Sequence, residues 1–353
     1  MRNNPAGLSP KPERFAVLFP CLERIAGDIG REAINWIVLM QDSVVDIPVD
    51  ASAASDKDSW LALIDLIGEE EGYFHTVGTH HWAMFVEDSP VLIVSFETID
   101  QARARSGQMP LAHHVAAAKG WSHLCLIADG PTWYRDPAVY AYFDRLVDDS
   151  FFEDFDRILF YGAGPSAYAA CAFSVTAPGA HVLALNPVAT LNPAQAGWDD
   201  RYKSARKHDF TSRYGYAPDM VEGCAHLSLV LDPRHKPDAM HAALFHAPYV
   251  TPLLARYAGG DVESVLSRLR VLTDLVILAA EGNLTPTSFA SLWRKRRDDA
   301  AYLKNLLQDV ELTGHKARAV VLCTNVVNRL KIQRFRKRLA ELTDPAKDAV
   351  ANT

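Results

Sequence analysis

The chain has 353 residues, of which 49% are hydrophobic and 22% charged, a balance typical of a soluble globular protein. Its 36 Lys and Arg residues against 43 Asp and Glu residues give a formal net charge of −7, which argues against nucleic-acid binding through overall charge. The five cysteines lie far apart and form no Cys-x-x-Cys pair, so the sequence supports neither a zinc knuckle nor a disulfide framework and predicts a reducing, cytoplasmic location.

The first 85 residues are predicted to form a helical flank. Residues 1–15 contain no apolar run, so we expect neither a signal peptide nor a membrane anchor. Apolar residues recur at helical spacing over residues 12–41. Ser59 is expected to cap a second helix at residues 60–71, and residues 75–85 alternate loosely, as a strand would.

Residues 86–260 are predicted to form an α/β core. Short apolar runs rich in β-branched residues occupy residues 91–96, 124–128, 158–161, 181–185 and 227–231. Such runs are typical of parallel strands that are covered on both faces. Helical segments at 108–119, 138–148 and 166–174 lie between most of them. This alternation predicts a doubly wound, mostly parallel sheet between N- and C-terminal helical flanks.

Residues 261–353 are predicted to be helical and to end in a tail. One helix is expected at 261–280, and the four charged residues within 262–280 mark it as a buried helix rather than a membrane span. Thr285-Pro286 is a typical start for a second helix, which is expected to run to about residue 307. A third is expected at 317–337. We interpret the basic runs 294–297 and 334–338 as solvated helix faces with local charge pairs.

The most informative segment is a strand that runs through a glycine turn into a helix at residues 158–173. Its centre reads Tyr-Gly-Ala-Gly-Pro-Ser-Ala-Tyr-Ala-Ala from Tyr161, which resembles the nucleophile elbow of the α/β-hydrolase fold. The resemblance implies that fold for the core, with an acid at Asp232 after a later strand and a histidine after the last strand. Gly164 stands at the nucleophile position, and residues 254–263 contain no histidine. Glycine adopts the strained turn at little cost, so the turn can persist without its hydroxyl.

Our first hypothesis is therefore an α/β-hydrolase-like protein that has lost its nucleophile and binds a small-molecule ligand or a protein partner, without nucleic acid or membrane. Gly162, Gly164 and Ser166 are the candidate ligand-binding residues of the turn. Trp133 and Arg135 follow the strand at 124–128 and join them, because an Arg between aromatic residues can clamp a carboxylate or phosphate. Such a cluster is more often a packed loop anchor. The sequence indicates no oligomeric state.

A second hypothesis is an active esterase-like serine hydrolase. Ser166 lies two residues past the turn, and His235, His241 and His246 flank Asp232. A triad of Ser166, His241 and Asp232 would supply the nucleophile, the base and the group that orients the base. In the alternative interpretation, Ser166 only serves the first helical turn. The segment 186–225 is longer than a plain crossover and is expected to be either a cap over the sheet edge or a helical pair without a special role.

A third hypothesis is a dinucleotide-binding oxidoreductase, because Gly162-x-Gly164-x-x-Ala167 resembles the Rossmann fingerprint of flavoproteins. That fingerprint needs an acid at the end of the next strand, where this chain has Asn186. The chain also resembles bacterial proteins labelled phosphoadenosine phosphosulfate reductase. Those reductases need a Glu-Cys-Gly-x-His context, whereas Cys323 stands in Val-Leu-Cys-Thr-Asn, so the motifs do not support the label. We predict no cofactor and no metal site.

Overall fold

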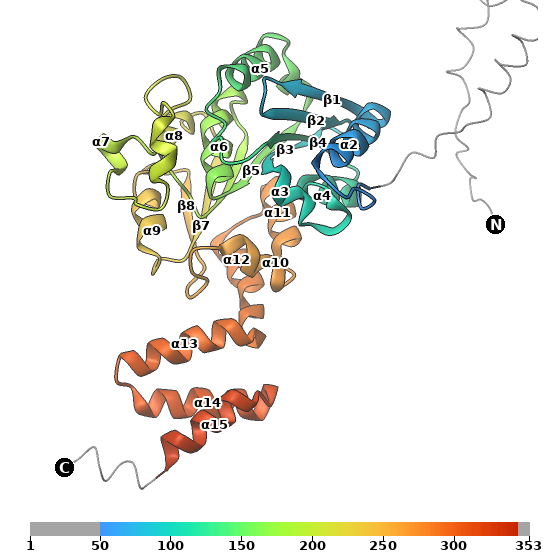
Figure 1. The fold of residues 1–353 in the computed structure, drawn as a ribbon. Helices are drawn as coiled ribbons and strands as arrows, with labels where there is room; N and C mark the ends of the chain where they lie inside the picture. The colour runs from blue at the N-terminus through green and yellow to red at the C-terminus, as the bar shows by residue number, and fades with distance from the viewer. Residues whose placement is uncertain (1–49, 345–353) are drawn as a thin grey trace, which may run out of the picture. The chain divides into compact units, whose positions relative to one another are not determined.

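A single eight-stranded sheet organises the computed structural model, which describes residues 50–344 (Figure 1). The predicted helix at 12–41 lies outside the described residues, and so does the predicted tail at 343–353 except for its first two residues. The strands are β1 Gly72–Val77, β2 His81–Val86, β3 Val91–Thr98, β4 Ser122–Ala128, β5 Arg157–Ala163, β6 His181–Leu185, β7 His226–Leu231 and β8 Val250–Leu254. Their order in the sheet is β1-β2-β4-β3-β5-β6-β7-β8. The contacts of β2 with β1 and β4 are antiparallel, and all other neighbours are parallel.

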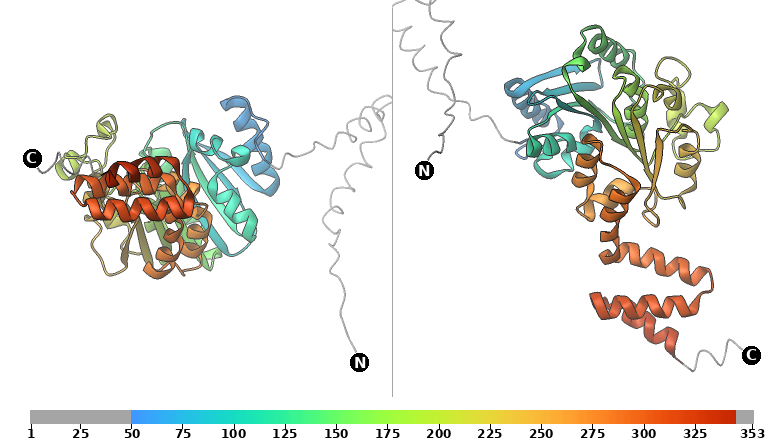
Figure 2. Two further views of the ribbon diagram at one scale, coloured as in Figure 1. Left: turned by 90° about the horizontal axis from the view of Figure 1, so that it is seen from below. Right: turned by 180° about the vertical axis from the view of Figure 1, so that it is seen from behind.

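Helices cover both faces of this sheet, as predicted for a doubly wound core. The helices are α2 Lys57–Glu71, α3 Ile99–Arg103, α4 Leu111–Lys119, α5 Pro137–Asp148, α6 Pro165–Phe173, α7 Pro193–Ala196, α8 Ala217–Met220, α9 Lys236–Ala242, α10 Val262–Arg268, α11 Leu272–Ala280, α12 Pro286–Trp293, α13 Ala300–Leu312, α14 Lys316–Leu330 and α15 Gln333–Thr343. On one face α5 and α6 share a buried cluster with the strands, and on the other face α4, α10 and α11 do so. The views from below and from behind show these layers (Figure 2).

The five strands predicted in the core are confirmed, because each is buried along most of its length and is therefore largely apolar. The sheet begins earlier than residue 86, however. The strand expected at 75–85 within the predicted helical flank is a hairpin of two strands, β1 and β2, which extends the sheet as an antiparallel edge. β1 is largely exposed, which explains why its apolar pattern is weak. The N-terminal cap of α2 is Asp56, and Ser59 is its capping-box partner.

The three helices predicted after residue 260 are each broken in two. Arg270 (φ 54°) separates α10 from α11, and Lys331 (φ 55°) separates α14 from α15, because residues in the left-handed region end a helix. Asp299 caps the start of α13 through the amide of Tyr302. The predicted cap at Thr285 is confirmed, with Pro286 as the first helical residue. α10, α11 and α12 pack on the sheet, whereas α13, α14 and α15 form a hydrophobic cluster of their own.

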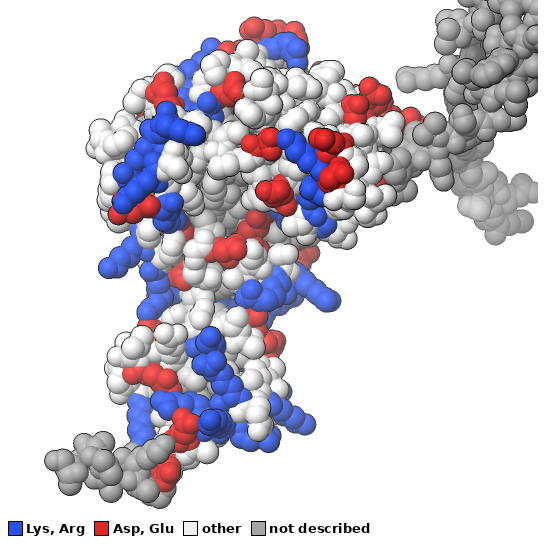
Figure 3. Space-filling model, in the orientation of Figure 1, with Lys and Arg blue, Asp and Glu red and all other residues white. Residues whose placement is uncertain are grey.

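The basic runs of the C-terminal helices lie at the surface, and some of their residues form local charge pairs. Exposed Lys and Arg side chains are prominent over this region in Figure 3. Arg338 bonds Glu311 and Glu341, and Arg329 pairs with Asp298. None of the helices in the described part of the chain combines the length and the apolar character that a membrane span needs.

Burial of histidines makes the stability of the fold depend on pH. His81 is fully buried in β2, and its Nε2 lies 2.7 Å from the hydroxyl of Thr132. Burial lowers the pKa of His81 to about 4, although Asp136 nearby raises it in part. The imidazole is therefore neutral in the folded protein and takes up a proton on unfolding at any pH between about 6.5 and 4.

We expect acidification from pH 7 to pH 5 to cost about 2 kcal/mol of folding free energy through His81 alone, because the unfolded chain binds one more proton there. Urea unfolding at both pH values measures this loss. The His81→Gln variant should lose about 2 kcal/mol less than the wild type over the same interval. His80→Gln is the matched control, since His80 is the exposed neighbour. An equal pH dependence in the wild type and His81→Gln would contradict the prediction.

Candidate functional site

The glycine turn between β5 and α6 has the geometry of a nucleophile elbow. Gly164 has φ 58° and ψ −118° and lies between the end of β5 and Pro165, the first residue of α6. Its amide donates a hydrogen bond to the carbonyl of Leu185 at the end of β6, at 2.8 Å. Positive φ of this kind favours glycine. The turn therefore stands at the carboxyl edge of the parallel strands, where open α/β folds bind their ligands.

The two glycines of the turn serve different purposes. A Cβ atom on Gly162 would lie 2.1 Å from the carbonyl oxygen of Ser166, so only glycine lets α6 approach β5 this closely. A Cβ atom on Gly164 would meet nothing within 4 Å. The tip of the elbow therefore has free space in the direction of a side chain, and glycine is needed there only for its backbone conformation.

Ser166 is buried and does not have the environment of an exposed nucleophile. It is buried in the first turn of α6, and its hydroxyl lies 3.3 Å from the hydroxyl of Tyr134. Burial raises the pKa of Tyr134 well above its ordinary value, so Tyr134 stays a neutral phenol. Ser166 is thus hydrogen-bonded to a group that cannot act as a base near neutral pH.

His241 is engaged in a different buried pair. Its Nε2 lies 3.0 Å from Oδ2 of Asp199, and its Nδ1 accepts a hydrogen bond from the amide of Ala189 at 3.2 Å. Burial lowers the pKa of His241, although Asp199 raises it in part. Hydrogen bonds from Arg201 outweigh the burial of Asp199 and lower the pKa of that carboxyl to about 2. The histidine is therefore a neutral donor to a fixed carboxylate.

Asp232, the third member of the predicted triad, binds backbone amides. Its Oδ1 accepts a hydrogen bond from the amide of Arg234 at 3.0 Å, and its Oδ2 accepts one from the amide of Gly259 at 2.8 Å. Gly259 belongs to the segment after β8, where the resemblance places the histidine. The structure thus gives Ser166, His241 and Asp232 separate hydrogen-bond partners and does not link them to one another.

Trp133 and Arg135 anchor the insertion at residues 186–225. The guanidinium of Arg135 donates to the carbonyls of Asp209 and Arg213 and to the hydroxyl of Ser212. The ring of Trp133 is buried against Tyr168 of α6 and against aromatic residues of the insertion. The insertion packs on α6 as well, since the hydroxyl of Tyr168 donates to the carbonyl of Tyr214. Both side chains match the packed-anchor interpretation.

Asn186, at the end of β6, stands where a dinucleotide site has an acid that binds the ribose, but its side chain is engaged in hydrogen bonds within the protein. Its φ is 49°, its Nδ2 donates to Asp238 at 2.6 Å and its Oδ1 accepts from the amide of Val262 at 2.8 Å. The strand before the glycine turn is also the fifth of its sheet rather than the first of a new βαβ unit. Both observations favour the hydrolase resemblance over the Rossmann fingerprint. Among the described residues, no cluster of three or more potential metal ligands occurs.

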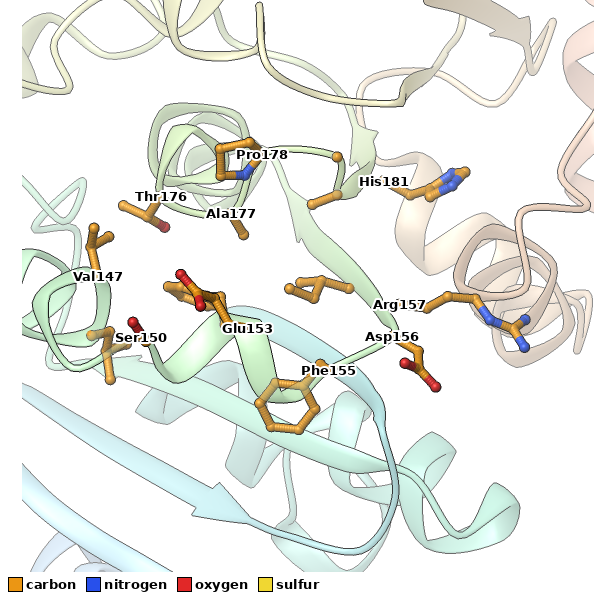
Figure 4. A pocket seen from close by; sticks show the side chains of 15 residues that line it. Val147, Ser150, Glu153, Phe155, Asp156, Arg157, Thr176, Ala177, Pro178 and His181 are labelled. Atoms are coloured by element: carbon orange, nitrogen blue, oxygen red, sulfur yellow. The ribbon is translucent and has the colours of Figure 1, made fainter.

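A pocket of about 580 Å³ lies at the opposite edge of the sheet, where β5 and β6 begin at Arg157 and His181 (Figure 4). It contains none of the site residues predicted from the sequence. A second pocket, of about 710 Å³, lies between the segment that follows β3 and helices α10 and α11. It includes Arg105 and Glu263, which sequence reasoning missed because they are 158 residues apart in the chain.

Comparison with known proteins gives fold similarity only. No protein-family model matches the sequence, and no curated protein does. Among solved structures, the capsule O-acetyltransferase of Neisseria meningitidis serogroup A is 10% identical, with a TM-score of 0.38 over 57% of this chain and 94% of that chain. An S-formylglutathione hydrolase from Agrobacterium tumefaciens is 10% identical, with a TM-score of 0.41 over 59% and 93%. The esterase domain of a Rhodothermus marinus protein is 12% identical, with a TM-score of 0.37 over 58% and 94%.

The strand order and the elbow define an α/β-hydrolase-like fold, as predicted from the sequence. The similarities to solved structures do not bear on what this chain binds or transforms.

Proposed function

We propose that this chain is a cytoplasmic, α/β-hydrolase-like binding protein that takes a small molecule or a protein partner and does not hydrolyse esters. The observation that carries the proposal is Gly164. The elbow keeps its strained conformation, and the residue at its tip has no side chain. Nucleophilic catalysis needs a hydroxyl or thiol at that point with a base within hydrogen-bond reach.

The position of Asp232 supports the same proposal. In a triad the acid orients the histidine that activates the nucleophile. Here the Asp232 carboxylate accepts hydrogen bonds from the amides of Arg234 and Gly259. It therefore stabilises the segment after β8 and does not orient a histidine. The amide of Thr98, the last residue of β3, is also engaged, since it donates to Oε1 of Gln101 at 2.8 Å. In α/β-hydrolases, one of the two backbone amides that stabilise the oxyanion comes from the segment after the third strand. The Thr98 amide, at the end of that strand in this chain, is therefore not free for such a role.

Labelling with a fluorophosphonate probe tests the proposal directly, because the probe reacts with activated serines. We expect the wild type to remain unlabelled and to show no hydrolysis of p-nitrophenyl acetate above the solvent rate. Ser166 has no histidine among its hydrogen-bond partners and should stay inert.

Two variants give this test its controls. Stoichiometric labelling of the wild type that is lost in Ser166→Ala, and kept in the exposed-serine variant Ser291→Ala, would overturn the proposal in favour of a serine hydrolase. Release of a flavin or nicotinamide on denaturation would overturn it in favour of the dinucleotide hypothesis.

A further inference from the structure

The pocket of about 710 Å³ beside α10 and α11 lies next to the elbow strand and has a size typical of small-molecule sites. Two of its lining residues, Arg105 and Glu263, are hydrogen-bonded to Glu97 near the carboxyl end of β3 and to Tyr161 of β5. Ser95 of β3 pairs with Tyr161 of β5, and Glu97 follows two residues further on, at the level of the glycine turn. The pocket therefore stands at the sheet edge where open α/β folds bind ligands.

Arg105 is held rigidly at the base of this pocket by two carboxylates. Its Nε donates to Glu97 and its Nη2 to Glu263, both at 2.7 Å. Glu97 is buried, and its other oxygen accepts a hydrogen bond from the amide of Leu111 at 2.7 Å. Burial opposes the charge of Arg105, yet the two glutamates outweigh it and raise the pKa of that guanidinium. Burial raises the pKa of Glu97, and Arg105 and the Leu111 amide counteract this by bonding its ionised form.

Glu263 has one carboxylate oxygen that takes part in no hydrogen bond with the described residues. Its Oε1 accepts hydrogen bonds from Arg105 and from the hydroxyl of Tyr161, the latter at 2.6 Å. Its Oε2 accepts none from the residues that the structure describes, and Glu263 lines the pocket. Two carboxylates face a single guanidinium, so when both are ionised Arg105 compensates only one of them. A ligand that brings a positive charge and a hydrogen-bond donor matches the other.

Four hydroxyl side chains also line the pocket, those of Ser106, Ser264, Ser267 and Thr273, together with Gln101, His114 and the apolar Ala104 and Leu111. Arg268 also lines the pocket, but its guanidinium is paired with Asp299 at 2.9 Å, so it adds no free cation. Hydroxyls donate and accept, and they suit a ligand that carries hydroxyls itself.

We propose that this pocket binds a small hydroxylated primary amine, whose ammonium group donates to Oε2 of Glu263 and whose hydroxyls bond the serine and threonine side chains. The proposal rests on the proposed function, since it treats the chain as a binding protein. The alternative role of Glu263 is purely structural: it ties α10 to β3 and β5 through Arg105 and Tyr161.

Isothermal titration calorimetry with glucosamine and glucose distinguishes the two roles, because these sugars differ only in the ammonium group that replaces a hydroxyl. The buffer is phosphate, since Tris is itself a hydroxylated primary amine. We expect saturable binding of glucosamine and at least tenfold weaker binding of glucose. A charge-assisted hydrogen bond of this kind accounts for about tenfold or more in affinity.

Glu263→Gln should weaken glucosamine binding at least tenfold, because the amide can still accept from Tyr161 but has no charge. Ser267→Ala, on the exposed side of α10, should weaken it severalfold without disturbing the Arg105 cluster. Glu281→Gln is the matched control, since Glu281 is paired with Lys119 outside the pocket. No saturable binding, equal binding of both sugars, or unchanged affinity in Glu263→Gln and Ser267→Ala would overturn the inference.

The result is separable from the test of the proposed function. Absence of glucosamine binding in a protein that is inert to fluorophosphonate would overturn the amine site and leave the binding-protein proposal standing. Labelling of Ser166 in a protein that binds glucosamine through Glu263 would overturn the binding-protein proposal and leave the amine site standing.

Discussion

Replacement of Gly162 by alanine is expected to prevent stable folding of the α/β core. The new Cβ atom would lie 2.1 Å from the carbonyl oxygen of Ser166, 2.3 Å from its carbonyl carbon and 2.7 Å from the amide nitrogen of Ala167. These are main-chain atoms in the first turn of α6, so no side-chain rotation relieves the clash. α6 is buried along its length and packs on β5 and β6. We expect a loss of more than about 4 kcal/mol, which is a large share of the stability of a typical domain.

Urea unfolding followed by circular dichroism measures this loss, and Gly164→Ala provides the matched control two residues away. An alanine at Gly164 would meet no atom within 4 Å, so it bears only the strain of φ 58°. That strain costs about 1–3 kcal/mol, and the variant should fold. Similar losses in the two variants would contradict the view that Gly162 is needed for close approach and Gly164 for conformation.

The sequence predicted both glycines as parts of an elbow and assigned the strained, positive-φ position to Gly164, which the structure confirms. It did not predict that Gly162 is needed for the close approach of α6 to β5. That role depends on the distance between α6 and β5, and no residue pattern encodes that distance. The elbow resemblance correctly predicted the fold of the core. The strands were also predictable, because near-continuous apolar runs such as residues 91–96 and 181–185 occur where strands are covered on both faces.

Elements at the margins of the core were harder to predict. β1 is mostly exposed, so its side chains do not alternate clearly. The break between α10 and α11 depends on Arg270, a residue type that does not mark a helix end. For β1 and for the break between α10 and α11, tertiary packing determines the structure, and the local sequence propensity does not indicate it.

The contacts of the candidate site were harder to predict from the sequence than the fold. Ser166, His241 and Asp232 have the residue types of a triad, and only the structure shows that each has other partners. Arg105 and Glu263 meet although they are 158 residues apart, and no spacing rule connects them. Trp198-Asp199-Asp200-Arg201 stood out in the sequence as a mixed-charge segment, but nothing in it indicated that Asp199 is buried against His241.

A buried polar network around Asp238 links that segment to the carboxyl edge of the sheet. Asp238 is fully buried. Its Oδ1 accepts from Arg201 at 2.7 Å, and its Oδ2 accepts from Asn186 at 2.6 Å. Asn186 in turn accepts from the amide of Val262, the first residue of α10. One carboxylate thereby fixes the insertion, the end of β6 and the start of the helix that carries Glu263.

Asp238→Ala should therefore destabilise the fold by about 3–5 kcal/mol, the usual effect of removing one partner of a buried charge pair. Arg201 would keep its bonds to Asp199 but lose one charge partner, and Asn186 would be left with an unpaired donor beside α10. Asp200→Ala is the matched control, because Asp200 is exposed and pairs with Lys203 at the surface, so its loss should stay within about 0.5 kcal/mol. Urea unfolding measures both variants, and hydrogen exchange at the amide of Val262 should accelerate in Asp238→Ala alone. Comparable stability of the two variants would show that the network does not hold the sheet edge together.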